Sequence, residues 1–183
     1  MSDDLFTVSV PDDALEAPAF ELMPTGAYRS TLQGGARVDE TNGWRRLHLP
    51  FRGFASAKLG KEFGAKTLEA RFPVEAPAGA AEGAVKAASI GQQAVIGAAA
   101  ALGLTESVQA ADGKTHQKLV ANSYDELVAQ FNAMAGTDVE VYVVAKPRMR
   151  NNAPVLRQDG TGPVMDNEIR NVRALAATNG GAA

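Results

Sequence analysis

Hydrophobic and polar positions alternate most regularly between residues 44 and 54. Leu47, Leu49 and Phe51 would share one face of a strand, whereas the aromatic and basic residues between them would share the other. The segment 27–37 is predicted to be the first strand and 44–54 the second, and the turn-forming letters DETNG between the two predict a β-hairpin. One side of this hairpin is therefore expected to be buried and the other to carry polar chemistry.

Strand-like alternation recurs in the segments 66–74, 138–146 and 167–175. Two helices are predicted between the first two of these. One is alanine-rich and covers 84–102, and the other covers 124–135 behind a serine–glutamate capping box. Gly91 and Gly97 would weaken the first helix, the stretch 105–118 is expected to be a polar loop, and 148–159 a ragged hairpin.

The predicted fold class follows from this order of three strands, a helical segment and two or three further strands. Helices do not alternate with strands, so a parallel βαβ sheet is excluded and the class is α+β, mainly β. The order permits a five-stranded, OB-like Greek-key barrel with a helical insertion between strands 3 and 4. A general α+β sheet is the alternative.

The 183 residues suit one domain. Residues 1–24 are acidic, contain three prolines and lack periodicity, so they predict a flexible arm before a domain over 25–175. Residues 176–183, with the letters ATNGGAA at the chain end, predict a disordered tail.

Charge is distributed unevenly along the chain. The net charge of −3 divides into −6 over residues 1–24, +5 over 25–71, −5 over 72–141 and +3 over 142–183. The two basic sections coincide with predicted strands. An anionic partner is therefore a reasonable expectation, and the acidic arm could compete with that partner for the basic residues.

Several kinds of chemistry have no pattern in the sequence. There are no cysteines, the two histidines lack metal-ligand spacing, and no nucleophile elbow or phosphate-binding glycine loop is present. Asp159, Asp166 and Glu168 remain as a minority alternative for a carboxylate site. We therefore expect no enzyme activity, no cofactor and no membrane span, and the absence of signal-peptide features predicts the cytosol.

The informative feature is the polar face of the second strand. Single-stranded nucleic acid is bound by basic groups that contact phosphates and by aromatic rings on which bases stack. Solvating charges and a tryptophan at the edge of the core are the alternative explanation for such residues. The residues predicted to bind DNA are Trp44, Arg46, His48, Arg52 and Phe54 on this strand, Lys58 and Lys61 in the following loop, Tyr142 and Lys146 on the fourth strand, and Arg148 and Arg150 in the late hairpin.

Several short motifs carry a family resemblance. The segments GAYRSTLQGG, NGWRRLHLPFRGF, SYDELVAQFNAMAGTDVEVYVVAK and DNEIRNV resemble phage-encoded OB-fold single-stranded-DNA-binding proteins, a family formerly described as a domain of unknown function. The resemblance covers about residues 25–175. It implies an OB barrel, DNA binding without catalysis, and a role in phage replication or recombination beside a recombinase or replication protein. Unlike the better-known bacterial proteins of this function, the chain has no acidic C-terminal tip.

Two other classes of function remain open. A virion decoration or scaffold protein would use the basic strand face as a contact between protein subunits, and an adaptor could mimic nucleic acid with its acidic arm. Exposed strand edges would allow a homo-oligomer. Binding that weakens steeply with salt would favour DNA over a packed protein interface.

Overall fold

The computed structural model describes residues 21–109, 113–151, 153–157 and 160–175. The fold is mainly β with two helices, which confirms the predicted α+β class. Residues 1–20 of the predicted arm and the predicted tail lie outside the described residues. The elements, in chain order, are β1 (Gly26–Leu32), β2 (Arg37–Thr41), β3 (Trp44–Ser56), β4 (Lys61–Glu75), α1 (Glu82–Ala101), β5 (Thr105–Gln109), β6 (Thr115–Leu119), α2 (Tyr124–Ala133), β7 (Asp138–Pro147), β8 (Met149–Arg150), β9 (Ala153–Pro154) and β10 (Met165–Arg173).

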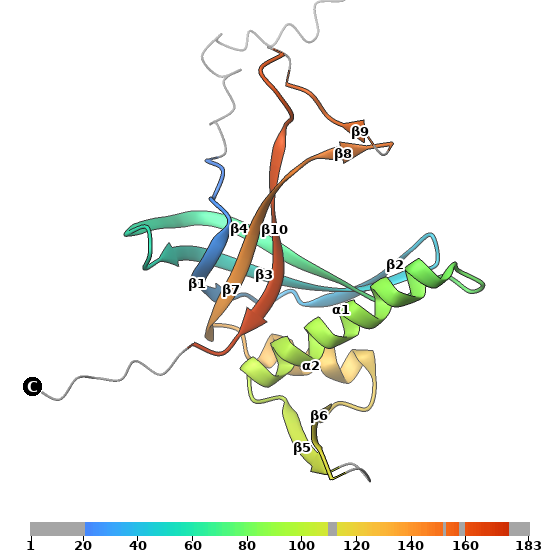
Figure 1. The fold of residues 1–183 in the computed structure, drawn as a ribbon. Helices are drawn as coiled ribbons and strands as arrows, with labels where there is room; N and C mark the ends of the chain where they lie inside the picture. The colour runs from blue at the N-terminus through green and yellow to red at the C-terminus, as the bar shows by residue number, and fades with distance from the viewer. Residues whose placement is uncertain (1–20, 110–112, 152, 158–159, 176–183) are drawn as a thin grey trace, which may run out of the picture.

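One antiparallel sheet of six strands forms the body of the molecule (Figure 1). Its order is β10-β7-β1-β3, with β1 and β2 following each other along one edge of β3 and β4 paired to the other edge. The sheet curls so that β4 approaches β10, and α1 packs against both of these strands. No ladder joins β4 to β10 within the described ranges, so the sheet is not a closed barrel.

The core lies on the concave side of this sheet, beneath the helices. The inward side chains of β3 include Leu47, Leu49 and Phe51, as the alternation predicts, and all three are buried. Tyr28 is also buried, with its ring edge-on to those of Phe54 and Phe63. Such edge-to-face aromatic pairs contribute about 0.5–1.5 kcal/mol beyond their buried area.

The core includes a residue that the sequence prediction places outside the domain. Met23, which the sequence pattern places in the acidic arm, is fully buried, and its backbone N–H donates to Asn167 Oδ1 at 2.9 Å. Asn167 returns a bond from its amide nitrogen to the Met23 carbonyl. This reciprocal pair joins the start of the described chain to β10. The sequence pattern did not identify Met23 as a core residue, because the segment around it has no hydrophobic periodicity.

The strongest local signals in the sequence correspond to real elements. The helix 84–102 is α1, and the helix 124–135 is α2, whose first turn is capped by the Ser123 hydroxyl accepting from Glu126 N–H at 3.1 Å. The predicted hairpin at 148–159 corresponds to the paired strands β8 and β9.

The prediction of a loop at 105–118 is wrong. Those residues lie mostly in the antiparallel pair β5–β6, which projects from the helices in Figure 1. Polar cross-strand bonds stabilise it, including Thr105 Oγ1 to Gln117 Oε1 at 2.8 Å and Gln117 Nε2 to Ser107 Oγ at 3.0 Å. Because these residues are polar on both faces, the hairpin has no hydrophobic alternation by which it could be recognised.

A β-bulge at Gly53 corrects the predicted position of Phe54. The register between β3 and β4 shifts between Arg52 and Phe54, and Gly53 there has a φ of +66°, which favours glycine. The extra residue reverses the inward and outward alternation. Phe54 is consequently buried in the core with 1 % exposure and cannot be a stacking platform for DNA.

The helix α1 lies unusually close to the backbone of β4 at Gly91. A Cβ atom built on this glycine would lie 1.8 Å from the carbonyl oxygen of Pro73, far inside any allowed contact. Gly91 lowers the intrinsic stability of the helix, but the absence of a side chain at this position is what allows α1 to pack on β4. The same atom at Gly97 would meet nothing closer than 3.9 Å.

We expect Gly91→Ala to destabilise the protein, because backbone must move to relieve the clash. Overpacking of this kind typically costs about 1–3 kcal/mol. Gly97→Ala is the matched control, since it adds the same methyl group to the same helix and should stabilise it by up to about 1 kcal/mol. Urea unfolding followed by circular dichroism measures both, and equal effects at the two positions would contradict this account of the interface.

No helix in the described part of the chain combines the length and apolar character needed to cross a bilayer.

Candidate nucleic-acid interface

We call the convex side of β2, β3 and β4 the outer face. It carries a row of basic residues. Its cross-strand register places Arg37 opposite His48 and His48 opposite Arg71. Like charges directly opposite each other destabilise a sheet. Two carboxylates, Asp39 on β2 and Glu69 on β4, lie at neighbouring positions of this face and separate the basic groups.

His48 does not face solvent, contrary to the prediction that it binds DNA directly. It is only 4 % exposed, because groups from the strands on both sides cover it. Its Nδ1 lies 2.9 Å from Glu69 Oε2, and its Nε2 lies 3.0 Å from Asp39 Oδ2 without the alignment of a hydrogen bond. With a proton on Nδ1, His48 donates to Glu69. We call His48 and the four charged residues around it, Arg37, Asp39, Glu69 and Arg71, the ionic cluster.

Glu69 is the carboxylate that contacts the three basic residues in this cluster. Its Oε1 accepts from Arg37 Nη1 at 2.6 Å, and its Oε2 accepts from Arg71 Nε at 3.0 Å. Burial acts to raise the pKa of the Glu69 carboxyl, but hydrogen bonds from His48, Arg37 and Arg71 outweigh burial and lower that pKa to about 2. The carboxylate is therefore charged throughout the neutral range and restrains both arginines.

Trp44 and Arg46 lie at the end of the outer face where β2 pairs with β3. The Arg46 guanidinium lies 5.7 Å from the centroid of the Trp44 ring, which is a cation–π contact. Farther along β3, Arg52 is exposed between Thr31 of β1 and Thr67 of β4. Within the described residues neither Arg46 nor Arg52 forms an ion pair.

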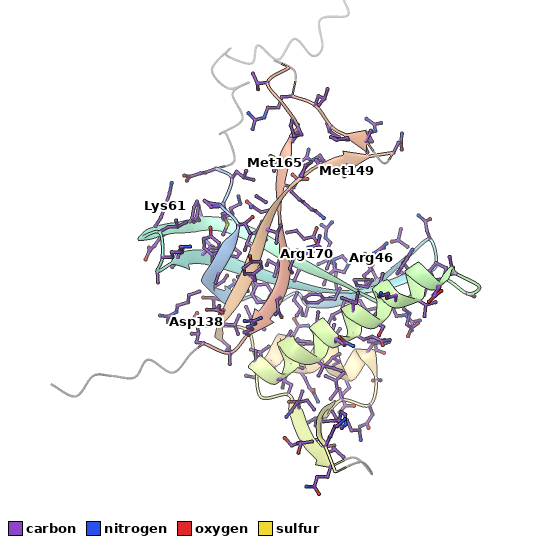
Figure 2. The ribbon with its side chains drawn as sticks, viewed as in Figure 1. Arg46, Lys61, Asp138, Met149, Met165 and Arg170 are labelled. Carbon is purple, nitrogen blue, oxygen red and sulfur yellow. The ribbon has the colours of Figure 1, made fainter. Side chains whose placement is uncertain are left out.

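The predicted lysines lie at the opposite end of the β3–β4 pair. Figure 2 places Lys61 and Arg46 at opposite ends of these strands. Lys58 is exposed in the turn between the strands, whereas Lys61 pairs with Glu21. Lys66, close by, donates to the Glu21 carbonyl at 2.6 Å, and its burial lowers the pKa of its ammonium group. Glu21, the first residue that the structure describes, therefore lies against the basic surface formed by these lysines.

Tyr142 is not brought together with Trp44. It is 45 % exposed, but it lies on β7, which β1 separates from β3 and β10 separates from β4. Outward side chains of β7 therefore point away from the outer face of β3 and β4. Lys146, on the same strand, pairs with Glu168 of β10, and its pKa is lowered by burial and by the nearby charge of Arg170.

The arginines of the late hairpin occupy a third location. Arg148 forms a bidentate ion pair with Asp166, in which Nε donates at 2.9 Å and Nη2 donates at 2.7 Å to the carboxylate oxygens. The bonds from Arg148 lower the pKa of the Asp166 carboxyl. Arg150 is exposed on β8, in the hairpin that stands away from the sheet in Figure 1. Of the two arginines, Arg150 is the one whose charge remains available to a ligand.

Sequence reasoning missed four members of the outer face: Arg37, Asp39, Glu69 and Arg71. The signal that could have found them is the spacing of two between Arg37 and Asp39 and between Glu69 and Arg71, which places each pair on one face of its strand. Their meeting around His48 depends on the register of three strands, which the spacing does not define.

Other chemistry is poorly represented in the described residues. They contain no group of three or more histidine, cysteine or carboxylate side chains arranged to bind a metal. An open hollow of about 390 Å³ lies between α1, β6 and the start of α2, with Val95, Ile96 and Leu127 in its walls. Its lining is predominantly apolar and carries neither carboxylate nor amine.

Comparisons with models of known families and with curated proteins find no match to this chain.

The ionic cluster predicts a specific dependence of stability on pH. Because the folded pKa of Glu69 lies at about 2, below the ordinary value of 4.5, its contribution is complete above about pH 4.5 and is lost as the pH falls towards 2. At about 1.4 kcal/mol per pKa unit, the contribution is on the order of 3 kcal/mol. Chemical unfolding of wild type and Glu69→Gln should differ by a constant, maximal amount above about pH 5, and the two should converge near pH 2.

Glu62→Gln is the control for this measurement, because Glu62 lies on the same strand, is exposed and has no ion pair among the described residues. Its effect should be small at every pH. A difference between wild type and Glu69→Gln that stays constant down to pH 2 would contradict the proposed charge contacts.

Proposed function

We propose that this protein binds single-stranded DNA without sequence specificity on the outer face of β2, β3 and β4. The observation that carries the proposal is the composition of that face. Four arginines, Arg37, Arg46, Arg52 and Arg71, stand against two carboxylates, and the chain's single tryptophan lies at its end. Basic groups for phosphates and an aromatic ring for a base are the two components such binding needs.

The strand order supports an OB-like arrangement as part of this proposal. The path β10-β7-β1-β3-β4, with β4 approaching β10, is the order in which a five-stranded Greek-key barrel would close. The helical insertion falls between β4 and β7, where such a barrel accepts it. On this model, DNA crosses β3 and β4, and the hairpins β2–β3 and β8–β9 flank its path.

The proposed role is that of a binding protein without catalysis in phage replication or recombination. It rests on the family resemblance of the sequence together with the basic outer face. Stacking tolerates every base and phosphate contacts carry no sequence information, so one such surface would protect any single strand.

The first test is a titration of a fluorescein-labelled oligo-dT of about 30 nucleotides, at low and at raised salt, followed by anisotropy and by Trp44 emission. We expect binding that weakens steeply with salt and quenches the tryptophan. Absence of binding at low salt would reject the proposal and favour a structural or assembly protein of the virion.

Two variants, one of a tryptophan and one of a tyrosine, test which surface binds DNA. Trp44→Ala should weaken binding, since a stacked base is worth about 1–3 kcal/mol. Tyr142→Ala removes an exposed aromatic ring from β7, which β1 separates from β3 and β10 separates from β4, and it should leave binding unchanged. The reverse result would move the interface to β7.

A further inference from the structure

We infer that Arg37, Arg71 and Glu69 form a phosphate-binding subsite in which the acidic residue positions the two arginines. The inference rests on the proposed function and assigns a ligand, a backbone phosphodiester, to a defined part of the outer face. Glu69 is a positioning residue here, because it would act through the arginines and make no contact with DNA itself.

The guanidinium groups retain donors for a ligand. Arg71 reaches Glu69 through Nε alone, so both of its terminal amino groups stay free, and its side chain is 67 % exposed. Arg37 reaches Glu69 through Nη1, and its Nη2 lies 3.4 Å from His48 Nδ1. Its side chain is 54 % exposed, so the Nε–H and the second N–H of each terminal nitrogen remain for a ligand. Two guanidinium groups held by one carboxylate present a preorganised pair of forks, the geometry that binds phosphate oxygens.

The buried half of the cluster makes this arrangement rigid. The side chain of Glu69 is 19 % exposed, and its Oε2 accepts from both Arg71 and His48. The His48 side chain is 5 % exposed between β2 and β4, with Asp39 beside its second nitrogen. A flexible surface arginine loses side-chain entropy when it binds, whereas arginines already restrained by a buried carboxylate lose less.

The test depends on the sign of the effect. Glu69→Gln removes a negative charge from a surface that would bind a polyanion, so simple electrostatics predicts tighter binding. Positioning predicts the opposite: affinity for oligo-dT at low salt about three- to tenfold weaker, with a salt slope reduced by roughly one phosphate contact. Glu62→Gln makes the same change of charge elsewhere on β4 and should leave binding equal or slightly tighter.

A second variant keeps the test decisive if Glu69→Gln fails to fold. Arg71→Lys retains the charge but loses the fork, and we expect several-fold weaker binding with little change in thermal unfolding. An oligo-dT with neutral methylphosphonate linkages should bind wild type and both variants equally, because the proposed contact is to the phosphate charge.

The outcomes separate this inference from the proposed function. If wild type binds oligo-dT but Glu69→Gln binds as tightly or more tightly, with Arg71→Lys unaffected, the subsite is wrong and DNA uses another part of the face. If wild type does not bind oligo-dT at low salt, the proposed function itself is rejected.

Discussion

The pairing of β3 along both of its edges is the constraint on which the rest of the structure depends. One edge carries β1 and then β2, and the other carries β4 over most of its length. The inward side chains of β3 supply much of the core, and its outward side chains lie between groups from both neighbouring strands. Burial of hydrophobic surface on one side thus defines the register that assembles the ionic cluster on the other.

The outer face illustrates how a sheet can hold like charges close together. Isolated ion pairs at a surface contribute little, because solvent screens them and long side chains lose entropy. The cluster around Glu69 differs because its histidine is buried and its carboxylate accepts from three donors. The carboxylates reduce the positive charge of the face but hold the remaining charge in fixed places, which is the property a polyanion-binding surface requires.

Local signals predicted the fold better than they predicted the site. The alanine content of α1, the cap at Ser123 and the alternation around Leu49 are short-range features, and the corresponding elements are present. Phe54 was misplaced because one positive-φ glycine reverses a strand's alternation, and His48 because its burial depends on groups from β2 and β4. Tyr142 was grouped with Trp44 because alternation identifies a face within a strand, whereas the order of strands decides which faces are shared.

The hairpin β5–β6 has a consequence for how the domain opens. It contacts the body mainly at its base, near α1, and most of its residues are exposed on both faces. A two-stranded ribbon without a buried face is marginally stable by itself. Its backbone amides should therefore exchange hydrogen for deuterium through local opening, well before those of β3, whose exchange requires the whole sheet to unfold. On this expectation, the basic sheet would exchange slowly and the hairpin β5–β6 would open independently of it.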